Sequence, residues 1–467
     1  MLSGAAKAFT TELYGVQTVN AKATASSVNV RSGGIQQVYS GGKSIKATVE
    51  NSDSVVINSG GVASSLVVNG GGMAFVYAAG KSIKAQIYGG AYQYVSGGID
   101  SSAVIHAGAS QVLSNAAQVY KTTLHGSQFV GSGAVASSAT VSAGGCQFVS
   151  AGGTVVGTKV SAGAMLDVEG GGMAKKITVA KGGKAQFGTN AVTSGLTVSA
   201  GAYAFVDSYV TMSGTTKVDG AVSFGGVGIN AAKLSTKKTT EINFDISSVS
   251  AISDKYMLTL GSKSTVAGQY TVAMAKTQSV GQYELSTGSK LAKDMSVTLK
   301  VDGIAIGTAI LNGEAVVANG ISYTLQSADQ TALTLTLSAV EGSMLKGAFA
   351  RGPMSGDSGC DVFYGSTGND TIYGNGGRDV AIYGSSDWGK DTIAATSGTM
   401  ALLFDGLSAD QVSSSLNGTT MTITRVGDAS QSVTVQGWND ATHSLVFGGS
   451  LSQVNAWMQA ASPTDIQ

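Results

Sequence analysis

Residues 141–153 read Val141-Ser-Ala-Gly-Gly-Cys-Gln-Phe-Val-Ser-Ala-Gly-Gly153, and this stretch decides the fold. Two runs rich in β-branched and aromatic residues are each closed by a glycine pair. The runs are too short to be helices, and glycine pairs at this spacing would interrupt a helix. Valine and phenylalanine favour strands. The stretch therefore predicts two short strands separated by tight turns.

The same pattern recurs at a nearly constant spacing on both sides of this stretch. Apolar residues equivalent to Val141 follow one another at intervals of 17 to 20 residues, most often 19. They are Val30, Val49, Val68, Ile87, Ile105, Leu124, Val141, Val160, Val179, Val198 and Val218. A fixed period near 20 is the signature of a solenoid, in which each turn stacks on the next. We therefore expect an all-β protein with a parallel β-solenoid of about 19 residues per turn over residues 30–227. Because the first turn of a solenoid exposes an unpaired sheet edge, residues 1–29 are expected to form a cap.

A second apolar column predicts which side chains point inward. Val130, Val149 and Val168 belong to a column in which every member is apolar. Two residues earlier, and thus on the same face of the strand, stand glutamines that would bond amide to amide along the solenoid: Gln36, Gln93, Gln111, Gln128 and Gln147. The intervening column would point outward as an aromatic stripe with Phe75, Tyr94, Val112, Phe129, Phe148 and Phe205. The opposite assignment of the two faces is the alternative.

Composition narrows the class of protein. The 467 residues include 66 glycines and 2 prolines, and only 12% are charged, with a net charge of zero. Nucleic acid is therefore not an expected partner. The two cysteines, Cys146 and Cys360, predict neither a disulfide framework nor a zinc site. No apolar run reaches 18 residues, so no transmembrane helix is expected, and the N-terminus lacks a standard secretory signal.

The pattern changes near residue 228, where glycine pairs stop and longer alternating runs begin. Examples are Thr240–Asp245, Gln269–Met274 and Ser296–Val301. Several alternating strands separated by turn residues are typical of an antiparallel sandwich. We expect a β-sandwich over residues 228–343.

A second repeat, with a period of nine residues, occupies residues 356–382. Asp361, Asp370 and Asp379 are nine residues apart, and a degenerate fourth unit contains Asp391. In a β-roll two such units make one turn, so Asp361 and Asp379 would flank one ion, and Asp370 and Asp391 a second. Oxygen ligands at glycine-rich turns suit Ca²⁺ rather than zinc. The candidate ligands are Gly356, Ser358, Asp361, Gly365, Thr367, Asp370, Gly374, Gly376, Asp379 and Asp391. A series of ordinary Gly/Asn/Asp turns is the alternative.

These nonapeptides resemble the RTX calcium-binding repeat, although Asp357, Ser366 and Asn375 stand where that repeat has its second glycine. The resemblance implies a small calcium β-roll over residues 344–400. It also implies a C-terminal β-segment and secretion signal over residues 401–467, with a short helix from Ser450 to Met458. In that family the uncleaved C-terminal signal implies the type I secretion machinery as a partner.

The 19-residue repeats resemble those of AIDA-type adhesin passengers, which carry the same glycine-pair and Gln-x-Val pattern. That resemblance implies a surface function and possible glycosylation of exposed serines such as Ser64, Ser101 and Ser137.

The leading hypothesis is a secreted or cell-surface adhesin or extracellular matrix protein without enzymatic activity. Its partners would be host or bacterial surface glycans or proteins, and calcium would couple export to folding. The alternatives are a self-assembling filament or surface-layer subunit, and a polysaccharide-active enzyme using Asp167, Glu169 and Asp207. His106 and His125 should lie in neighbouring turns, where two histidines without a third ligand are usually only neighbours.

Overall fold

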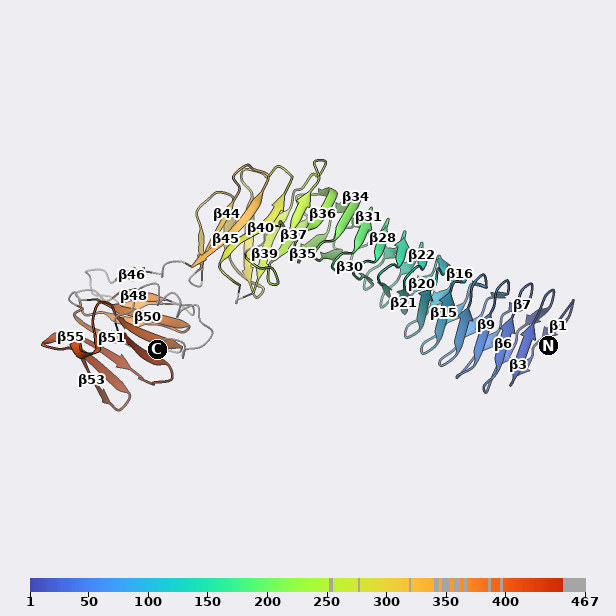
Figure 1. Cartoon of the computed structure of the whole chain (residues 1–467), viewed down its shortest axis with the longest axis horizontal. Helices are drawn as coiled ribbons and strands as arrows, with labels where there is room; N and C mark the ends of the chain where they lie inside the picture. Colours follow the sequence, from blue (N-terminus) through green and yellow to red (C-terminus); the bar gives the residue numbers. More distant parts are fainter. Residues whose placement is uncertain are drawn as a thin grey trace. The chain divides into compact units, whose positions relative to one another are not determined.

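A computed structural model of the chain describes residues 1–251, 255–275, 278–318, 321–339, 344–346, 353–356, 361–364, 368–384, 388–394 and 398–447. The chain divides into two compact units (Figure 1). Unit 1 comprises Met1–Gly313 and Leu325–Leu335. Unit 2 comprises Glu314–Thr324 and Thr336–Gln467.

Unit 1 is a parallel β-solenoid, as the sequence predicts. One turn contains β24 (Cys146–Val149), β25 (Thr154–Val156) and β26 (Lys159–Val160), and the next begins with β27 (Met165–Val168). Val141, Val160 and Val179 are direct neighbours on adjacent turns. Each turn has three strands rather than the two expected runs, so the turns stack into three parallel ladders. We call them the first, second and third ladders, after β24, β25 and β26.

The first ladder contains most of the predicted columns. Its parallel strands are β3 (Val16–Val19), β6 (Ile35–Val38), β9 (Ser54–Ile57), β12 (Met73–Val76), β15 (Tyr92–Ser96), β18 (Ser110–Ser114), β21 (Ser127–Val130), β24, β27, β30 (Lys184–Phe187), β33 (Tyr203–Val206), β35 (Ala221–Phe224), β37 (Glu241–Asp245), β39 (Gln269–Met274) and β41 (Ser296–Val301).

Glycine recurs at the turns because the backbone there adopts positive φ. Gly144 and Gly152 have φ of 77° and 75°. The turn between the second and third ladders also needs this conformation, since Ser138 has φ of 56° and Gly157 has φ of 67°. A residue without a Cβ adopts this region at no steric cost. The glycine pairs seen in the sequence are thus the corners of the coil.

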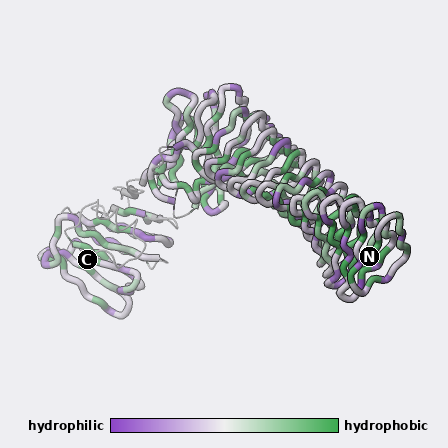
Figure 2. The backbone as a smooth tube through the Cα atoms, turned by 45° about the vertical axis from the view of Figure 1, so that its right-hand side comes forward, coloured by the Kyte–Doolittle hydropathy of each residue, from purple (hydrophilic) through white to green (hydrophobic). Residues whose placement is uncertain are grey.

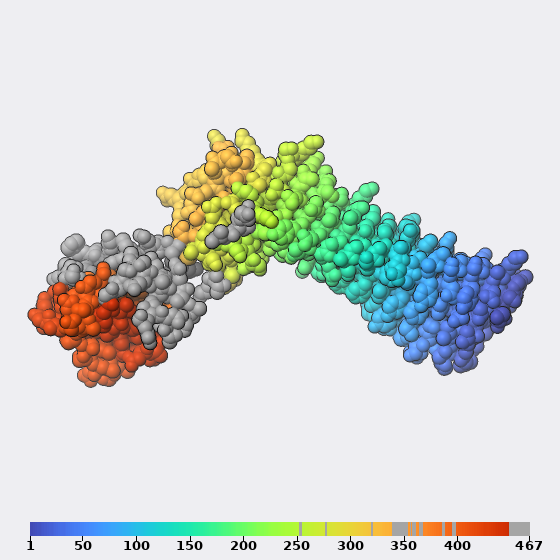
Figure 3. Space-filling model, viewed as in Figure 1, coloured from blue at the N-terminus to red at the C-terminus, as the bar shows by residue number. Residues whose placement is uncertain are grey.

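The core lies between the three ladders. Val130, Val149, Val168 and the other residues of their column are fully buried. Hydrophobic and hydrophilic positions alternate along the coils (Figure 2). The turns are packed in sequence order, so the colour changes gradually along unit 1 (Figure 3). Because the column of Val130, Val149 and Val168 is buried, its predicted inward orientation is correct and the opposite assignment of the two faces is excluded.

The N-terminal residues belong to the solenoid and do not form the separate cap expected for residues 1–29. β1 (Lys7–Phe9) pairs in parallel with β4 (Thr24–Ser26), and β2 (Glu12–Leu13) with β5 (Asn29–Val30). β3 pairs with β6, which aligns Gln17 with Gln36 and Val19 with Val38. The sequence hides this first turn because it lacks the glycine pairs that mark the later ones.

The solenoid also continues beyond residue 228, where the expectation of an antiparallel sandwich over 228–343 is wrong for most of the segment. β35, β37, β39 and β41 pair in parallel as further strands of the first ladder. The period lengthens there: Ala221 pairs with Glu241, Glu241 with Gln269, and Tyr270 with Val297. The longer connections between strands conceal the repeat in the sequence. In addition, hydrophobic and polar residues alternate along a half-buried parallel strand just as they do along an antiparallel one. Antiparallel pairing begins only with β42 (Ile304–Ile310), which covers the edge of β41.

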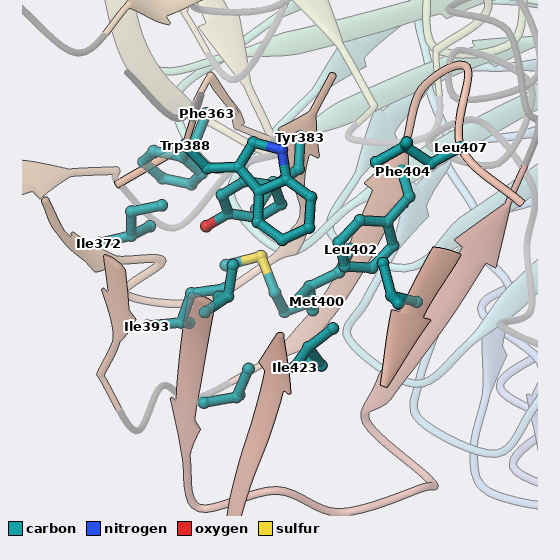
Figure 4. Close-up of a cluster of buried hydrophobic side chains, with 14 of the residues drawn as sticks. Phe363, Ile372, Tyr383, Trp388, Ile393, Met400, Leu402, Phe404, Leu407 and Ile423 are labelled. Carbon is teal, nitrogen blue, oxygen red and sulfur yellow. The ribbon is translucent and has the colours of Figure 1, made fainter. Parts of the chain in front are cut away.

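Unit 2 is built around two sheets, and successive strands alternate between them up to β52. One sheet contains β46 (Met344–Lys346), β48 (Val362–Tyr364), β50 (Arg378–Tyr383), β52 (Thr399–Phe404) and β56 (His443–Phe447). The other contains β47 (Pro353–Ser355), β49 (Thr371–Tyr373), β51 (Lys390–Ile393), β53 (Val412–Asn417), β54 (Thr420–Arg425) and β55 (Asp428–Gln436). Phe363, Tyr383, Trp388 and Phe404 are among the buried side chains that form its core (Figure 4). The helix expected at Ser450–Met458 lies outside the described residues.

Candidate functional site

The structure brings together the first pair of aspartates that the nine-residue repeat singles out. β48 and β50 are parallel neighbours, so the residues just before Val362 and Val380 lie side by side. The Asp361 backbone N–H donates to Asp379 Oδ1 over 3.0 Å. Gly356 and Gly374 lie against these carboxylates so closely that a Cβ on either would collide with an aspartate oxygen. The glycines therefore leave room for the carboxylates at the turn.

The second pair has the same geometry on the other sheet of unit 2. Asp370 precedes β49, Asp391 lies in β51, and these strands pair in parallel. The Asp370 N–H donates to Asp391 Oδ1 over 2.8 Å. Asp391 Oδ2 is buried and has no hydrogen-bond partner among the described residues. The Tyr383 hydroxyl lies near enough to lower the pKa of this carboxyl but makes no hydrogen bond of normal geometry with it, so the pair presents a buried carboxylate oxygen with room for a better partner.

Burial makes these carboxylates costly when no cation is present. Each of the four aspartates is at most 5% exposed. Burial, reinforced by the neighbouring Asp370 carboxylate, raises the pKa of Asp391 to about 7. A divalent cation would remove both the repulsion within the pair and the cost of burying its charge. An unsatisfied oxygen beside a second carboxylate is therefore a donor set that fits Ca²⁺.

The other predicted ligands divide between described and undescribed positions. Gly376 has φ of 127°, in the backbone region that favours glycine. Ser358, Gly365 and Thr367 lie outside the described residues. Within the described ranges no cluster of three or more His, Cys, Asp or Glu side chains forms a metal site. Two carboxylates at each position would need carbonyl and hydroxyl oxygens to complete a calcium shell.

Inside the solenoid, four of the five predicted glutamines form a buried ladder of side-chain amides, while Gln36 donates separately to Gln17. Gln147 Nε2 donates to Gln128 Oε1 over 2.6 Å. Gln128 Nε2 donates to Gln111 Oε1 over 2.5 Å, and Gln111 Nε2 to Gln93 Oε1 over 2.7 Å. Thr158 Oγ1 donates to Gln147 Oε1 over 2.9 Å. Each of these amides thus donates to the glutamine of the preceding turn. At the other end of the ladder, the Thr158 hydroxyl donates to the Gln147 oxygen, which no further glutamine reaches.

The donor end of this glutamine ladder is closed by Asp100, a residue that sequence reasoning missed. Asp100 is fully buried and accepts from Gln93 Nε2 (3.2 Å) and Gln111 Nε2 (2.9 Å). Burial raises its pKa to about 6, against the hydrogen bonds from Ser82, Gln93 and Gln111, which lower it. The signal was present in the sequence, because Asp100 interrupts an inward column that otherwise carries Ala63, Ser82, Val119 and Ala136.

We expect Asp100 to make the solenoid less stable as the pH rises. A carboxyl whose folded pKa is raised contributes stability below its unfolded pKa, near 4, and loses it as the pH rises through its folded pKa, here about 6. Asp100→Asn should abolish this dependence, so its stability relative to wild type should rise by about 2 kcal/mol between pH 4 and pH 7. Urea unfolding followed by far-ultraviolet circular dichroism measures the difference. The exposed Glu169→Gln is the control, and a parallel pH profile for Asp100→Asn and wild type would contradict the expectation.

The outer face of the first ladder carries the predicted aromatic stripe. Phe75 and Tyr94 stack with centroids 5.4 Å apart, and Phe129 and Phe148 with centroids 5.0 Å apart. Tyr77 and Tyr92 flank the first stack and are 44% and 43% exposed, while Phe129 is 41% exposed. Because the rings stack on one another across turns, the stripe presents a row of aromatic edges to solvent.

The remaining sequence candidates lie on the surface of the solenoid. Asp167 is half-buried on the outer face, and its pKa is raised by burial and by Glu169. Asp207 accepts hydrogen bonds from the Thr189 hydroxyl and from the Ser208 N–H. His106 stacks on Tyr88 with centroids 4.1 Å apart, and its pKa is lowered by burial and by His125. These contacts place the two histidines in neighbouring turns, as expected.

Comparison with known proteins finds a similar solved structure but no matching family. No family model matches the chain, and no curated protein matches it. One similar solved structure is described as "Crystal structure of TibC-catalyzed hyper-glycosylated TibA55-350 fragment". It shares 22% identity, covers 56% of this chain and 97% of that chain, and has a TM-score of 0.47. A likeness at this level does not define a function. No helix among the described residues is long and apolar enough to cross a membrane.

Proposed function

We propose that this chain is a secreted or cell-surface adhesin or matrix protein without enzymatic activity, and that the first ladder is its contact surface. The observation that carries the proposal is the aromatic stripe, in which Phe75 and Tyr94 are partly exposed and Phe129 is exposed, together with the exposed flanking rings of Tyr77 and Tyr92. Aromatic side chains supply large contact areas in protein interfaces at a low cost in conformational entropy. The glutamine ladder behind the stripe holds the strands in one register. Surface glycans or proteins are the partners that this face would bind.

The paired aspartates of unit 2 support calcium-dependent folding after export. Without calcium the buried carboxylates repel one another, so unit 2 would be only marginally stable inside the cell. Where calcium is abundant, its binding free energy becomes folding free energy. Type I secretion, in which the chain crosses unfolded, is the export route that this coupling suits.

The stripe predicts a specific loss of adhesion. We expect the triple variant Tyr77→Ser, Tyr92→Ser, Phe129→Ser to lower binding to cells or coated surfaces at least tenfold, because it removes the exposed rings in and beside the stripe. The matched control is Ile83→Ser with Tyr120→Ser, since both residues are exposed to a similar degree on the second ladder. Retention of labelled full-length protein on the surface is the measurement. Equal losses in the two variants would contradict the role of the stripe.

Self-assembly into a filament or surface layer is the second candidate function, and one observation favours it. Met1, Phe9, Tyr14 and Val16 are large apolar residues that are at least 62% exposed, and all belong to the first turn. Sheet edges with exposed apolar side chains associate readily with further strands. Analytical ultracentrifugation with and without calcium separates the two functions: a monodisperse particle supports adhesion, whereas a concentration-dependent series of polymers supports assembly.

A polysaccharide-active enzyme would instead need two carboxylates at a defined separation. Asp167 lies on the outer face of β27 (Met165–Val168), and Glu169 follows two residues later, just after the strand ends. Release of reducing ends from candidate polysaccharides, compared between wild type and Asp167→Asn, tests this alternative directly.

A further inference from the structure

The wide part of the solenoid encloses a cavity of about 380 Å³ that none of the functions above uses. Its wall is formed by Leu234, Ile242, Phe244, Leu258, Leu260 and Met295, all of which are buried. They come from β37 of the first ladder, from β36 (Ile229–Thr236), which spans the second and third ladders, from β38 (Leu258–Leu260) of the second, and from the connection before β41. The cavity lies where the period lengthens from 20 to 28 residues, as the pairings of Glu241 show. The side chains of these longer turns do not fill the interior of the solenoid.

The mouth of the cavity differs chemically from its wall. Lys238 and Lys290 line it and are exposed, and Asp294 is the one carboxylate in its lining. An adjoining depression of about 500 Å³ shares Lys290 with the cavity and is lined by the hydroxyls of Thr236, Ser262 and Ser264. An apolar interior thus opens onto a surface of hydroxyl groups with a net positive charge.

We propose that this cavity binds the alkyl chain of a fatty acid, with the carboxylate held at the mouth by Lys238 and Lys290. Apolar cavities of this kind stay dry and accept apolar ligands. Pockets for small molecules usually combine an apolar lining with a few polar groups that orient the ligand. Tyr270, Ser286, Ser289 and Ser296 also belong to the lining, but the large buried side chains of the wall are apolar and suit an alkyl chain. The two lysines at the opening match a single anionic head group, whereas the Thr236 and Ser264 hydroxyls are already hydrogen-bonded to the backbone of Ala267 and Leu234.

A homologous series of saturated fatty acids tests the interior. Binding of hexanoate to hexadecanoate by the full chain is measured by isothermal titration calorimetry below the micellar concentrations. Affinity should rise about fourfold per added methylene until the chain fills the cavity, and then level off. An affinity that does not depend on chain length would overturn the proposal.

Variants separate the wall from the mouth. Ala267→Trp places a large ring in a half-buried position of the lining and should abolish binding of both decanoate and the neutral decanol. Lys238→Glu with Lys290→Glu should weaken decanoate about tenfold and leave decanol unchanged. Ile304→Trp, at an exposed position of β42, is the control for an added ring. Unchanged binding of both ligands to Ala267→Trp would show that the cavity is not the binding site. Equal losses of decanoate and decanol in the double lysine variant would show that the lysines do not bind the carboxylate.

Discussion

Calcium at 100 times its dissociation constant should raise the free energy of unfolding of unit 2 by about 5 kcal/mol. The figure follows from two independent sites, each contributing about 2.7 kcal/mol at that excess of ligand. The physical reason is the burial of Asp361 with Asp379 and of Asp370 with Asp391, since each pair concentrates negative charge where water is excluded. Asp379→Asn and Asp391→Asn should each remove about half of the increase, because each leaves one pair intact.

The chain offers a selective probe for this experiment. Its three tryptophans, Trp388, Trp438 and Trp457, all belong to unit 2, so tryptophan fluorescence reports on that unit while far-ultraviolet circular dichroism is dominated by the solenoid. The exposed Asp410→Asn serves as the matched control. Magnesium serves as a second control, because its small octahedral shell fits a flexible oxygen site poorly. A fluorescence transition that does not move when calcium is added would refute calcium-dependent folding.

Gln128→Ala should destabilise the solenoid by about 4 kcal/mol. Gln111 Oε1 loses its donor and Gln147 Nε2 loses its acceptor, and both remain buried. An unsatisfied buried polar group costs about 1–3 kcal/mol, and the cavity left by the side chain adds to this. Ala74, Ala185 and Ala204 occupy the same position in other turns, so the backbone accepts alanine there. The loss therefore measures the interrupted ladder rather than a steric misfit.

The control for Gln128→Ala is a glutamine on the outer face of the first ladder, outside the glutamine ladder. Gln186 points outward from β30 and is exposed, so Gln186→Ala removes the same atoms without leaving a buried partner. Urea unfolding of the two variants compares them directly. A Gln128→Ala variant as stable as Gln186→Ala would show that the amide ladder contributes nothing to the fold.

Periodicity made the solenoid predictable, because each stacked turn must place a small set of residue types at the same positions. Val141, Val160 and Val179 recur for this reason, and the glutamines align because every turn repeats the same inward positions. The prediction failed where the repeat weakens. The first turn lacks glycine pairs, and beyond Ala221 the connections lengthen while the parallel pairing persists. Strand alternation alone does not distinguish parallel from antiparallel neighbours.

The pairing of the aspartates in the candidate site could be predicted, because the nine-residue spacing of the repeat determines which of them are neighbours. A nine-residue repeat places Asp361 beside Asp379 once two units complete a turn, and the extra residues before Asp391 are accommodated without losing the second pair. The position of Asp100 in an inward column could be read from the repeat, but its hydrogen bonds could not, because they come from glutamines of two other strands. The cavity lined by Leu260 and Met295 was equally hidden, since no local pattern encodes a space that side chains leave open.

The near-identity of successive coils has an evolutionary consequence. A residue in one coil meets the equivalent residue of the next, as Gln128 meets Gln147, so loss or duplication of a whole coil replaces one set of neighbours with an equivalent set. Each such event would change the length of the solenoid by roughly 4.8 Å, the spacing between neighbouring strands, without changing the sequence of its first or last turn. The length of the solenoid can thus change with the number of coils, without new contacts between coils.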